Sequence, residues 1–320
     1  MKKTVLLILF QIICVSGFSE NPRWKVFGTP IPAHADLDVR WEAPNKFVGS
    51  NVPTNKWPSK MWVYSIEPRR FSSKVISNLM AMCSFTEKDK VQQDSNGMTF
   101  RSGARILSIS FPSGSIQYQT PEPNYGPTHL AQDVPSMSQI PKLTKKFLSV
   151  VGLKLSEIER NTNGAPNFDF WQPLSVYYLK SGSITNVAFR AVVFRRAVDG
   201  AEVIGDAGYC QLHFGERGRI SQIDFSWPDL KQYKSAATLK PETIIQLIRN
   251  GKAHQGLLPM GFDPIEWLAV KSVTVKQAWP CYFGGDSRLY PFLDLWTTVE
   301  APQGYVDIEI DCPIIDETKL

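Results

Sequence analysis

The sequence predicts an α+β fold in which short helices pack on curved antiparallel sheets. Alternating apolar and polar residues dominate the chain. The longest such stretch, Val187–Trp227, contains turn signals at Asp199-Gly200 and Gly215–Gly218, as an antiparallel meander would. Short amphipathic segments precede three sets of these strands, an order that is typical of helices covering one face of a sheet.

The N-terminus has the pattern of a secretory signal peptide. Lys2-Lys3 precede the apolar run Val5–Val15, and small residues follow. A membrane anchor is the alternative, but this run is shorter than the roughly 20 residues that span a bilayer. The sequence therefore predicts a signal peptide over residues 1–19, cleaved near Gly17 or Ser19. The mature chain is then expected to be secreted or periplasmic, with no membrane span.

The next two segments are predicted to be an extended arm and a helix–hairpin unit. Residues 20–70 are rich in proline and tryptophan, which disfavours helix and favours an arm lying along the folded body. Residues 71–120 begin with an amphipathic helix capped by Ser72, and Pro112–Gly114 mark a later turn. The expected elements are strands at Leu37–Trp41 and Met61–Ile66, a helix at Ser73–Met82, and a hairpin of Ile106–Phe111 with Ile116–Tyr118.

The remainder of the chain is predicted to form two similar units, residues 121–237 and 238–320. Each begins with a helix that ends at a glycine, Gly152 in the first and Gly251 in the second. Strands follow each helix. The expected elements are helices at Gln139–Val151 and Pro241–Asn250, with strands at Leu174–Lys180, Val187–Trp227, Val270–Trp279, Leu289–Val299 and Tyr305–Cys312.

Composition and motifs argue against several classes of function. The net charge is +5, and the lysines and arginines are scattered, so no nucleic-acid partner is predicted. The four histidines have no metal-ligand spacing, and the chain contains no CxxC, HExxH or GxSxG motif. The sequence therefore predicts no metal, no cofactor and no catalytic residues.

Four cysteines remain once the predicted signal peptide is removed. An oxidising compartment would permit two disulfides. The favoured pair is Cys281 with Cys312, because both lie in the C-terminal strand region. The alternative is that all four cysteines are buried free thiols.

Two polar strand faces are candidate binding surfaces. Cys210 points away from His213, so the two cannot form a catalytic pair; the row Tyr209, Gln211 and His213 is expected on the exposed face. On the last strand, carboxylates alternate with apolar residues. This acidic ladder is either a solvated face or a contact surface for a basic partner; it consists of Asp307, Glu309 and Asp311.

An alternative prediction is an extracellular hydrolase or carbohydrate-active enzyme. Its site would lie between the Trp-rich arm and the sheet, with an acid pair drawn from Asp224, Asp294 and Glu300. Trp227 and Trp279 each precede a proline at the end of a predicted strand. Their indoles are expected to close the edge of the core, although exposed rings could also stack on a sugar or a peptide.

The segments FRRAVDGAEVIGD and YCQLHFGERGRISQIDFSWPDL resemble the secreted PepSY-like family and its cystatin-like relatives. The resemblance rests on short turn motifs over roughly residues 139–312. It implies tandem units in which a helix is cradled by a curved antiparallel sheet, with no catalytic residues. It also implies a non-enzymatic binding or regulatory protein that acts by surface contact with an extracellular protein or a peptidase.

Overall fold

The computed structural model shows a predominantly β protein. It describes residues 29–43, 58–121, 125–126, 128–161, 163–179, 182–256, 265–284 and 287–316. In these residues, 51% lie in strands and 17% in helices. The predicted α+β class with tandem helix-on-sheet units is therefore wrong. The predicted signal peptide, residues 1–19, lies outside the described residues, as do residues 20–28 and 44–57 of the predicted arm.

The three predicted helices are present at nearly the predicted positions. They are α1 (Ser73–Met82), α2 (Ile140–Val151) and α3 (Pro241–Arg249). The Ser72 hydroxyl accepts a hydrogen bond from the Val75 amide, which confirms it as the N-cap of α1. Gly152 closes α2 in the left-handed conformation, with φ of 70°.

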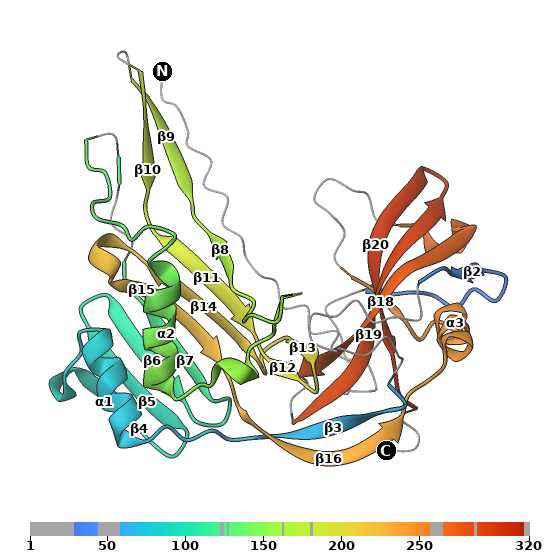
Figure 1. Cartoon of the computed structure of the whole chain (residues 1–320), viewed down its shortest axis with the longest axis horizontal. Helices are drawn as coiled ribbons and strands as arrows, with labels where there is room; N and C mark the ends of the chain where they lie inside the picture. The colour runs from blue at the N-terminus through green and yellow to red at the C-terminus, as the bar shows by residue number, and fades with distance from the viewer. Residues whose placement is uncertain are drawn as a thin grey trace.

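The first of two lobes, the helix-covered lobe, is built on an eight-stranded sheet. Helices α1 and α2 cover one face of this sheet (Figure 1), and both contribute to a single apolar core with it. Three short 3₁₀ helices, Glu87–Asp89, Leu155–Glu157 and Glu216–Gly218, lie in its connections. In spatial order its strands are β4 (Lys90–Gln93), β5 (Gly97–Ser102), β6 (Arg105–Ser110), β7 (Ser115–Gln119), β15 (Ile220–Ser226), β14 (Tyr209–Phe214), β11 (Arg190–Arg195) and β8 (Asp169–Trp171).

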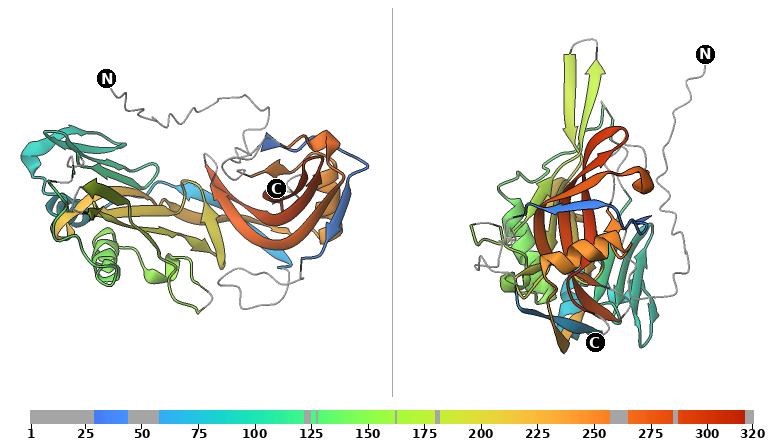
Figure 2. Two further views of the ribbon diagram at one scale, coloured as in Figure 1. Left: turned by 90° about the horizontal axis from the view of Figure 1, so that it is seen from above. Right: turned by 90° about the vertical axis from the view of Figure 1, so that its right-hand side faces the viewer.

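The second lobe, the long-strand lobe, is built on a ten-stranded sheet. Its three longest strands are strongly bent (Figure 2), and α3 packs against β2 and β20. A 3₁₀ helix, Trp267–Ala269, precedes β18. The strands are β1 (Thr29–Pro30), β2 (Asp38–Trp41), β3 (Lys60–Glu67), β12 (Ala197–Val198), β13 (Ala201–Ile204), β16 (Asp229–Ala237), β17 (His254–Gln255), β18 (Ser272–Gly284), β19 (Arg288–Ala301) and β20 (Gly304–Pro313).

A two-stranded hairpin projects from the helix-covered lobe. It consists of β9 (Leu174–Leu179) and β10 (Gly182–Val187), which pair only with each other in the described part of the chain (Figure 1). Two hydrophobic side chains on β9, Leu174 and Tyr178, are 59% and 86% exposed. The predicted strand at Leu174–Lys180 is therefore part of a solvent-exposed ribbon and not of the core.

Strands from different predicted units share one sheet. Strand β7, from the predicted helix–hairpin unit, pairs with β15, from the next unit. Strands β12 and β13 leave the helix-covered lobe, and β13 pairs in parallel with β18 of the other lobe. The apolar periodicity of a strand identifies which face is buried but does not identify which strand lies beside it.

Four connections cross between the lobes at nearly the same place. Strand β3 leads to α1 through Pro68–Phe71, and β11 continues through Arg196 into β12. Strand β13 returns to β14 through Gly205–Gly208, and β15 continues through Trp227 and Pro228 into β16. Strands β3 and β16 pair antiparallel along their whole length and run from one lobe to the other (Figures 1 and 2). These crossings fix the position of one lobe relative to the other.

Gly114, in the β6–β7 turn, contacts one of these crossings, and replacing it with alanine is expected to be costly. Its φ is +58°, and a Cβ would lie 2.8 Å from the Trp227 carbonyl oxygen and 2.9 Å from Cα of Pro228. Gly103 is a matched control, because its φ is +61° and a Cβ there would meet nothing within 4 Å. We expect Gly103→Ala to lower the free energy of unfolding by about 1 kcal/mol, and Gly114→Ala by about 2 kcal/mol more. Urea denaturation would measure both; equal losses would contradict the close contact.

Candidate functional site

A cavity of about 550 Å³ lies where the two lobes meet. Its walls come from β11 and the start of β8 in the helix-covered lobe and from β13, β18, β19 and β20 in the long-strand lobe. Among the described residues that line it, six carry carboxyl groups and one, Arg195, is basic. We call it the acidic cavity. The carboxyl groups belong to Glu159, Asp169, Glu202, Asp294, Glu309 and Asp311.

The register of the long strands brings two of these carboxyl groups together with an indole ring. Asp294 on β19 is paired directly with Asp311 on β20 and with Trp279 on β18. Directly paired residues of antiparallel strands point to the same face, with Cβ atoms about 4.5–5.5 Å apart. Glu309 joins this row because it lies two residues before Asp311 on the same strand. The row lies on the cavity wall.

Burial raises the pKa of both aspartates in the row. Asp294 is only 7% exposed, and its burial, reinforced by the charges of Glu309 and Asp311, raises its pKa to about 8. A hydrogen bond from the Trp279 side chain opposes part of this rise. Burial, together with the Glu309 charge, likewise raises the pKa of Asp311 to about 7. Near neutral pH the row therefore holds both protonated and ionised carboxyl groups.

The opposite wall of the acidic cavity contains Arg195, the one basic group among the described lining residues. A nitrogen of Arg195 lies 3.1 Å from a carboxylate oxygen of Glu202. Burial raises the pKa of Glu202 to about 7, the charges of Glu159 and Asp169 add to the rise, and Arg195 opposes it. One guanidinium therefore faces several carboxyl groups, and the cavity retains an excess of acid.

Asp294 also has an unsatisfied hydrogen-bonding atom. Its Oδ1 is buried and accepts no hydrogen bond from any residue that the structure describes. Buried carboxylate oxygens ordinarily have donors, because an unpaired buried acceptor costs about 1–3 kcal/mol. A donor entering the acidic cavity would satisfy this oxygen.

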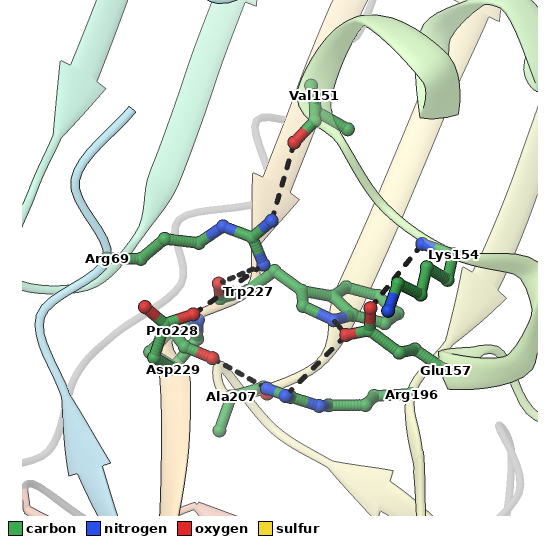
Figure 3. Close-up of polar contacts among 9 residues, drawn as sticks. All are labelled: Arg69, Val151, Lys154, Glu157, Arg196, Ala207, Trp227, Pro228 and Asp229. Atoms are coloured by element: carbon green, nitrogen blue, oxygen red, sulfur yellow. Dashed lines mark hydrogen bonds and ion pairs between the residues drawn. The ribbon is translucent and has the colours of Figure 1, made fainter. Parts of the chain in front are cut away.

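A buried polar network next to the cavity holds the crossing segments together (Figure 3). The Arg196 guanidinium donates a 2.6 Å hydrogen bond to the Pro228 carbonyl, lies 3.8 Å from Glu157, and stacks over the Trp227 ring. Arg69 donates to the carbonyls of Trp227 and Val151. Because burial dominates the environment of Arg196, its pKa falls to about 10. We call this cluster the junction network.

The junction network and the acidic cavity share the same two segments of chain. Arg195 faces the cavity, whereas the next residue, Arg196, faces the junction network. In the same way, Glu159 lines the cavity, whereas Glu157 belongs to the junction network. The network therefore fixes the backbone that supports one wall of the cavity.

The structure separates the three acids proposed for a hydrolase. Asp224 lies in the helix-covered lobe, paired with Gln211 and Gln117. Glu300 lies near the far end of β19, where it accepts a hydrogen bond from Ser272. Only Asp294 lies in the acidic cavity, and its carboxyl neighbours come from the predicted acidic ladder and from β13.

The acidic ladder divides between solvent and cavity. Asp307 is exposed outside the cavity, Glu309 is exposed but also lines the cavity, and Asp311 is partly buried in the cavity wall. Sequence reasoning missed Glu202 and Glu159, because no pattern of residues relates them to β20. The parallel pairing of β13 with β18 is what brings Glu202 to the cavity.

Tyr209, Gln211 and His213, the predicted binding surface on β14, are linked by hydrogen bonds, but none of the three is fully exposed. Tyr209 donates to Gln211, and a nitrogen of Gln211 lies 2.5 Å from Nε2 of His213. His213 is 5% exposed and stacks on Phe189, with ring centroids 4.1 Å apart. Burial lowers its pKa to about 4. The prediction that His213 lies on an exposed surface is therefore wrong.

The favoured disulfide is incompatible with the sheet register. Cys281 pairs with Phe292 and Cys312 pairs with Leu293, so their side chains lie on opposite faces of the sheet. Accordingly, Cys281 packs in a small cluster beside the cavity and Cys312 packs in the main core of the lobe. All four described cysteines are buried free thiols.

No family model matches the chain, and no curated protein matches it. Within the described ranges, no set of three or more His, Cys, Asp or Glu side chains is placed to hold a metal ion. None of the described helices combines the length and apolar character needed to cross a membrane. The site must therefore be interpreted from its own geometry.

Proposed function

We propose that the protein is a secreted, non-enzymatic binding protein that takes a cationic group, an ammonium or a guanidinium, into the acidic cavity. The observation that carries this proposal is the buried Oδ1 of Asp294, which has no donor among the described residues and lies on the wall of a cavity rich in carboxyl groups. A charged N–H donor would supply the missing hydrogen bond. The cavity volume of about 550 Å³ lies within the range usual for small-ligand sites.

The remaining lining of the cavity supports the same ligand class. Repulsion among the carboxyl groups contributes to the raised pKa values of Asp294 and Glu202, and a bound cation would relieve it. The Trp279 ring offers an aromatic surface for a cation–π contact. A lysine or arginine side chain of an extracellular protein or a peptidase would present such a group, as would a free amine.

Isothermal titration calorimetry with four probes would test the proposal. Spermidine represents a free amine, the peptides Gly-Lys-Gly and Gly-Arg-Gly represent side chains, and calcium chloride tests a metal ion. We expect saturable binding of at least one organic cation, and at least a tenfold loss of affinity in Asp294→Asn. Asp307→Asn is the matched control, because Asp307 lies on β20 but is exposed outside the cavity. Binding of calcium alone, or no binding of any probe, would refute the proposal.

Cation affinity should rise with pH. The cation favours the ionised carboxylate, so its binding must displace the proton of Asp294, whose pKa is about 8. We expect affinity for spermidine or the tripeptides to increase about 50-fold between pH 6 and pH 8, then level off. Titrations at constant ionic strength would measure this slope. An affinity that is independent of pH, or that falls as pH rises, would exclude Asp294 as the acceptor.

A second candidate function, glycoside hydrolysis, is favoured by one specific observation. Asp294, with a pKa of about 8, faces Asp311 across the ladder, and a protonated carboxyl beside an ionised one is the pairing glycosidases use. Release of nitrophenol from aryl glycosides would test it. Hydrolysis that is abolished by both Asp294→Asn and Asp311→Asn would establish an enzyme in place of the binding protein.

A further inference from the structure

A second cavity, of about 360 Å³, lies in the helix-covered lobe. It is lined by the start of β6, the end of α1 with the residues that follow it, and the β14–β15 turn. Three of its lining residues are arginines, Arg105, Arg217 and Arg219, and we call it the arginine pocket. The charge of its lining is opposite in sign to that of the acidic cavity.

The arginines of the pocket outnumber the described carboxylates around it, of which Asp89, outside the lining, interacts with the charge of Arg105. None of its three arginines forms an ion pair with any residue described in the structure. Glu216 is the only carboxylate among the described lining residues, and its Oε1 already accepts a hydrogen bond from the Gln132 amide. Three guanidinium groups therefore line one cavity that has a single, engaged counter-charge.

The backbone around the arginine pocket holds these groups in defined positions. Arg105 donates to the carbonyl oxygen of Ser84 at 3.2 Å. Ser84 and Arg217 have φ of 59° and 55°, and Asp133, whose carbonyl accepts from the Arg217 amide, has φ of 53°. Left-handed φ is costly for residues other than glycine and persists where the surrounding structure imposes it. Such residues gather at this pocket.

The pocket also has an aromatic and hydroxyl-bearing surface. Phe189 and Tyr125 line it, and Tyr118 places its hydroxyl beside the Cys83 carbonyl. Guanidinium groups bind the oxygens of phosphate and sulfate through paired hydrogen bonds. An aromatic wall suits the ring of a sugar that bears such a group.

We infer that the arginine pocket binds a phosphate or sulfate group, and that it does so independently of the acidic cavity. The shared chemistry is that of a tetrahedral oxyanion. It can come from the free inorganic ion or from an ester on a sugar. The pocket would recruit this anion while the acidic cavity between the lobes holds a cationic ligand.

Calorimetric titration with four probes would test the inference: inorganic phosphate, sulfate, glucose 6-phosphate and glucose 6-sulfate, at constant ionic strength. We expect saturable binding of at least one probe and at least a tenfold loss of affinity in the double variant Arg217→Ala/Arg219→Ala. Both side chains are exposed, so the fold should tolerate their removal. Arg101→Ala, an exposed arginine on β5 outside the pocket, is the matched control and should bind normally.

The outcomes separate the two sources of the anion and the two sites. At least tenfold tighter binding of a sugar ester would identify an ester ligand, whereas equal affinities would identify the free ion; both support the inference. Asp294→Asn should leave binding of these anions unchanged, so failure of one site does not imply failure of the other. No saturable binding of any probe, or equal affinity in the double variant, would overturn it.

Discussion

Asp294→Asn is expected to stabilise the protein at alkaline pH. The raised pKa means that the folded state holds the proton of Asp294 more tightly than the unfolded chain does. The contribution of Asp294 to the free energy of unfolding is fully present below about pH 3.9, the pKa of an aspartate in the unfolded chain. This contribution is lost as the pH rises through the pKa of about 8 in the folded state. Asparagine does not ionise. We therefore expect its gain in free energy of unfolding to be about 4 kcal/mol larger at pH 8.5 than at pH 5.

Urea denaturation of wild type and variant at the two pH values would measure this difference. Asp307→Asn serves as the control, because Asp307 is exposed outside the cavity. If Asp294→Asn gives the same change at pH 5 and pH 8.5, the carboxyl group does not ionise in the way proposed. The variant should also lose affinity for cations. The carboxyl group that binds the cation therefore lowers the stability of the ligand-free protein.

Replacing Arg196 with methionine is expected to give the largest loss of stability. Arg196 is buried, with 8% of its surface exposed. Its guanidinium donates a hydrogen bond to the Pro228 carbonyl and pairs with Glu157 in the junction network. Methionine preserves most of the apolar stem but leaves a buried carbonyl without its donor. We expect the free energy of unfolding to fall by about 3 kcal/mol or more, since breaking a buried pair typically costs 3–5 kcal/mol.

Two companion variants would show that this loss comes from the junction network. Arg101→Met removes an exposed arginine and should change stability by less than about 0.5 kcal/mol. Glu157→Gln alone, and combined with Arg196→Met, completes a double-mutant cycle in which the two losses should not add. Additive losses, or a loss in Arg196→Met no greater than in Arg101→Met, would contradict the proposed role.

The sequence predicts elements well where their periodicity reflects burial. Ser72 and Gly152 mark helix ends that the structure confirms, and the hairpin across Pro112–Gly114 is present as β6 and β7. The segments missed were polar strands. Gly97–Ser102 and Asp229–Ala237 were not predicted as strands, because strands that expose much of their surface show little apolar alternation.

The fold class and the site could not be predicted for a different reason. Asp294 was identified as a candidate acid, yet its actual neighbours, Asp311, Trp279 and Glu202, are determined by strand register and by a strand that crosses between lobes. Neither property leaves a periodic signal in one strand alone. The same limit explains the Cys281–Cys312 prediction, because two cysteines in neighbouring strands can still face opposite sides.

The pairing of β3 with β16 bears on how the chain folds. Glu67 and Asp229 are paired, so nearly everything between them is an insertion within what would otherwise be a hairpin of the long-strand lobe. Closing so long a loop carries an entropic cost, and contacts between distant residues form slowly. The inserted lobe lowers that cost when it folds, because its own sheet brings its two ends together. Assembly of the long-strand lobe therefore depends on a segment that contributes few of its strands.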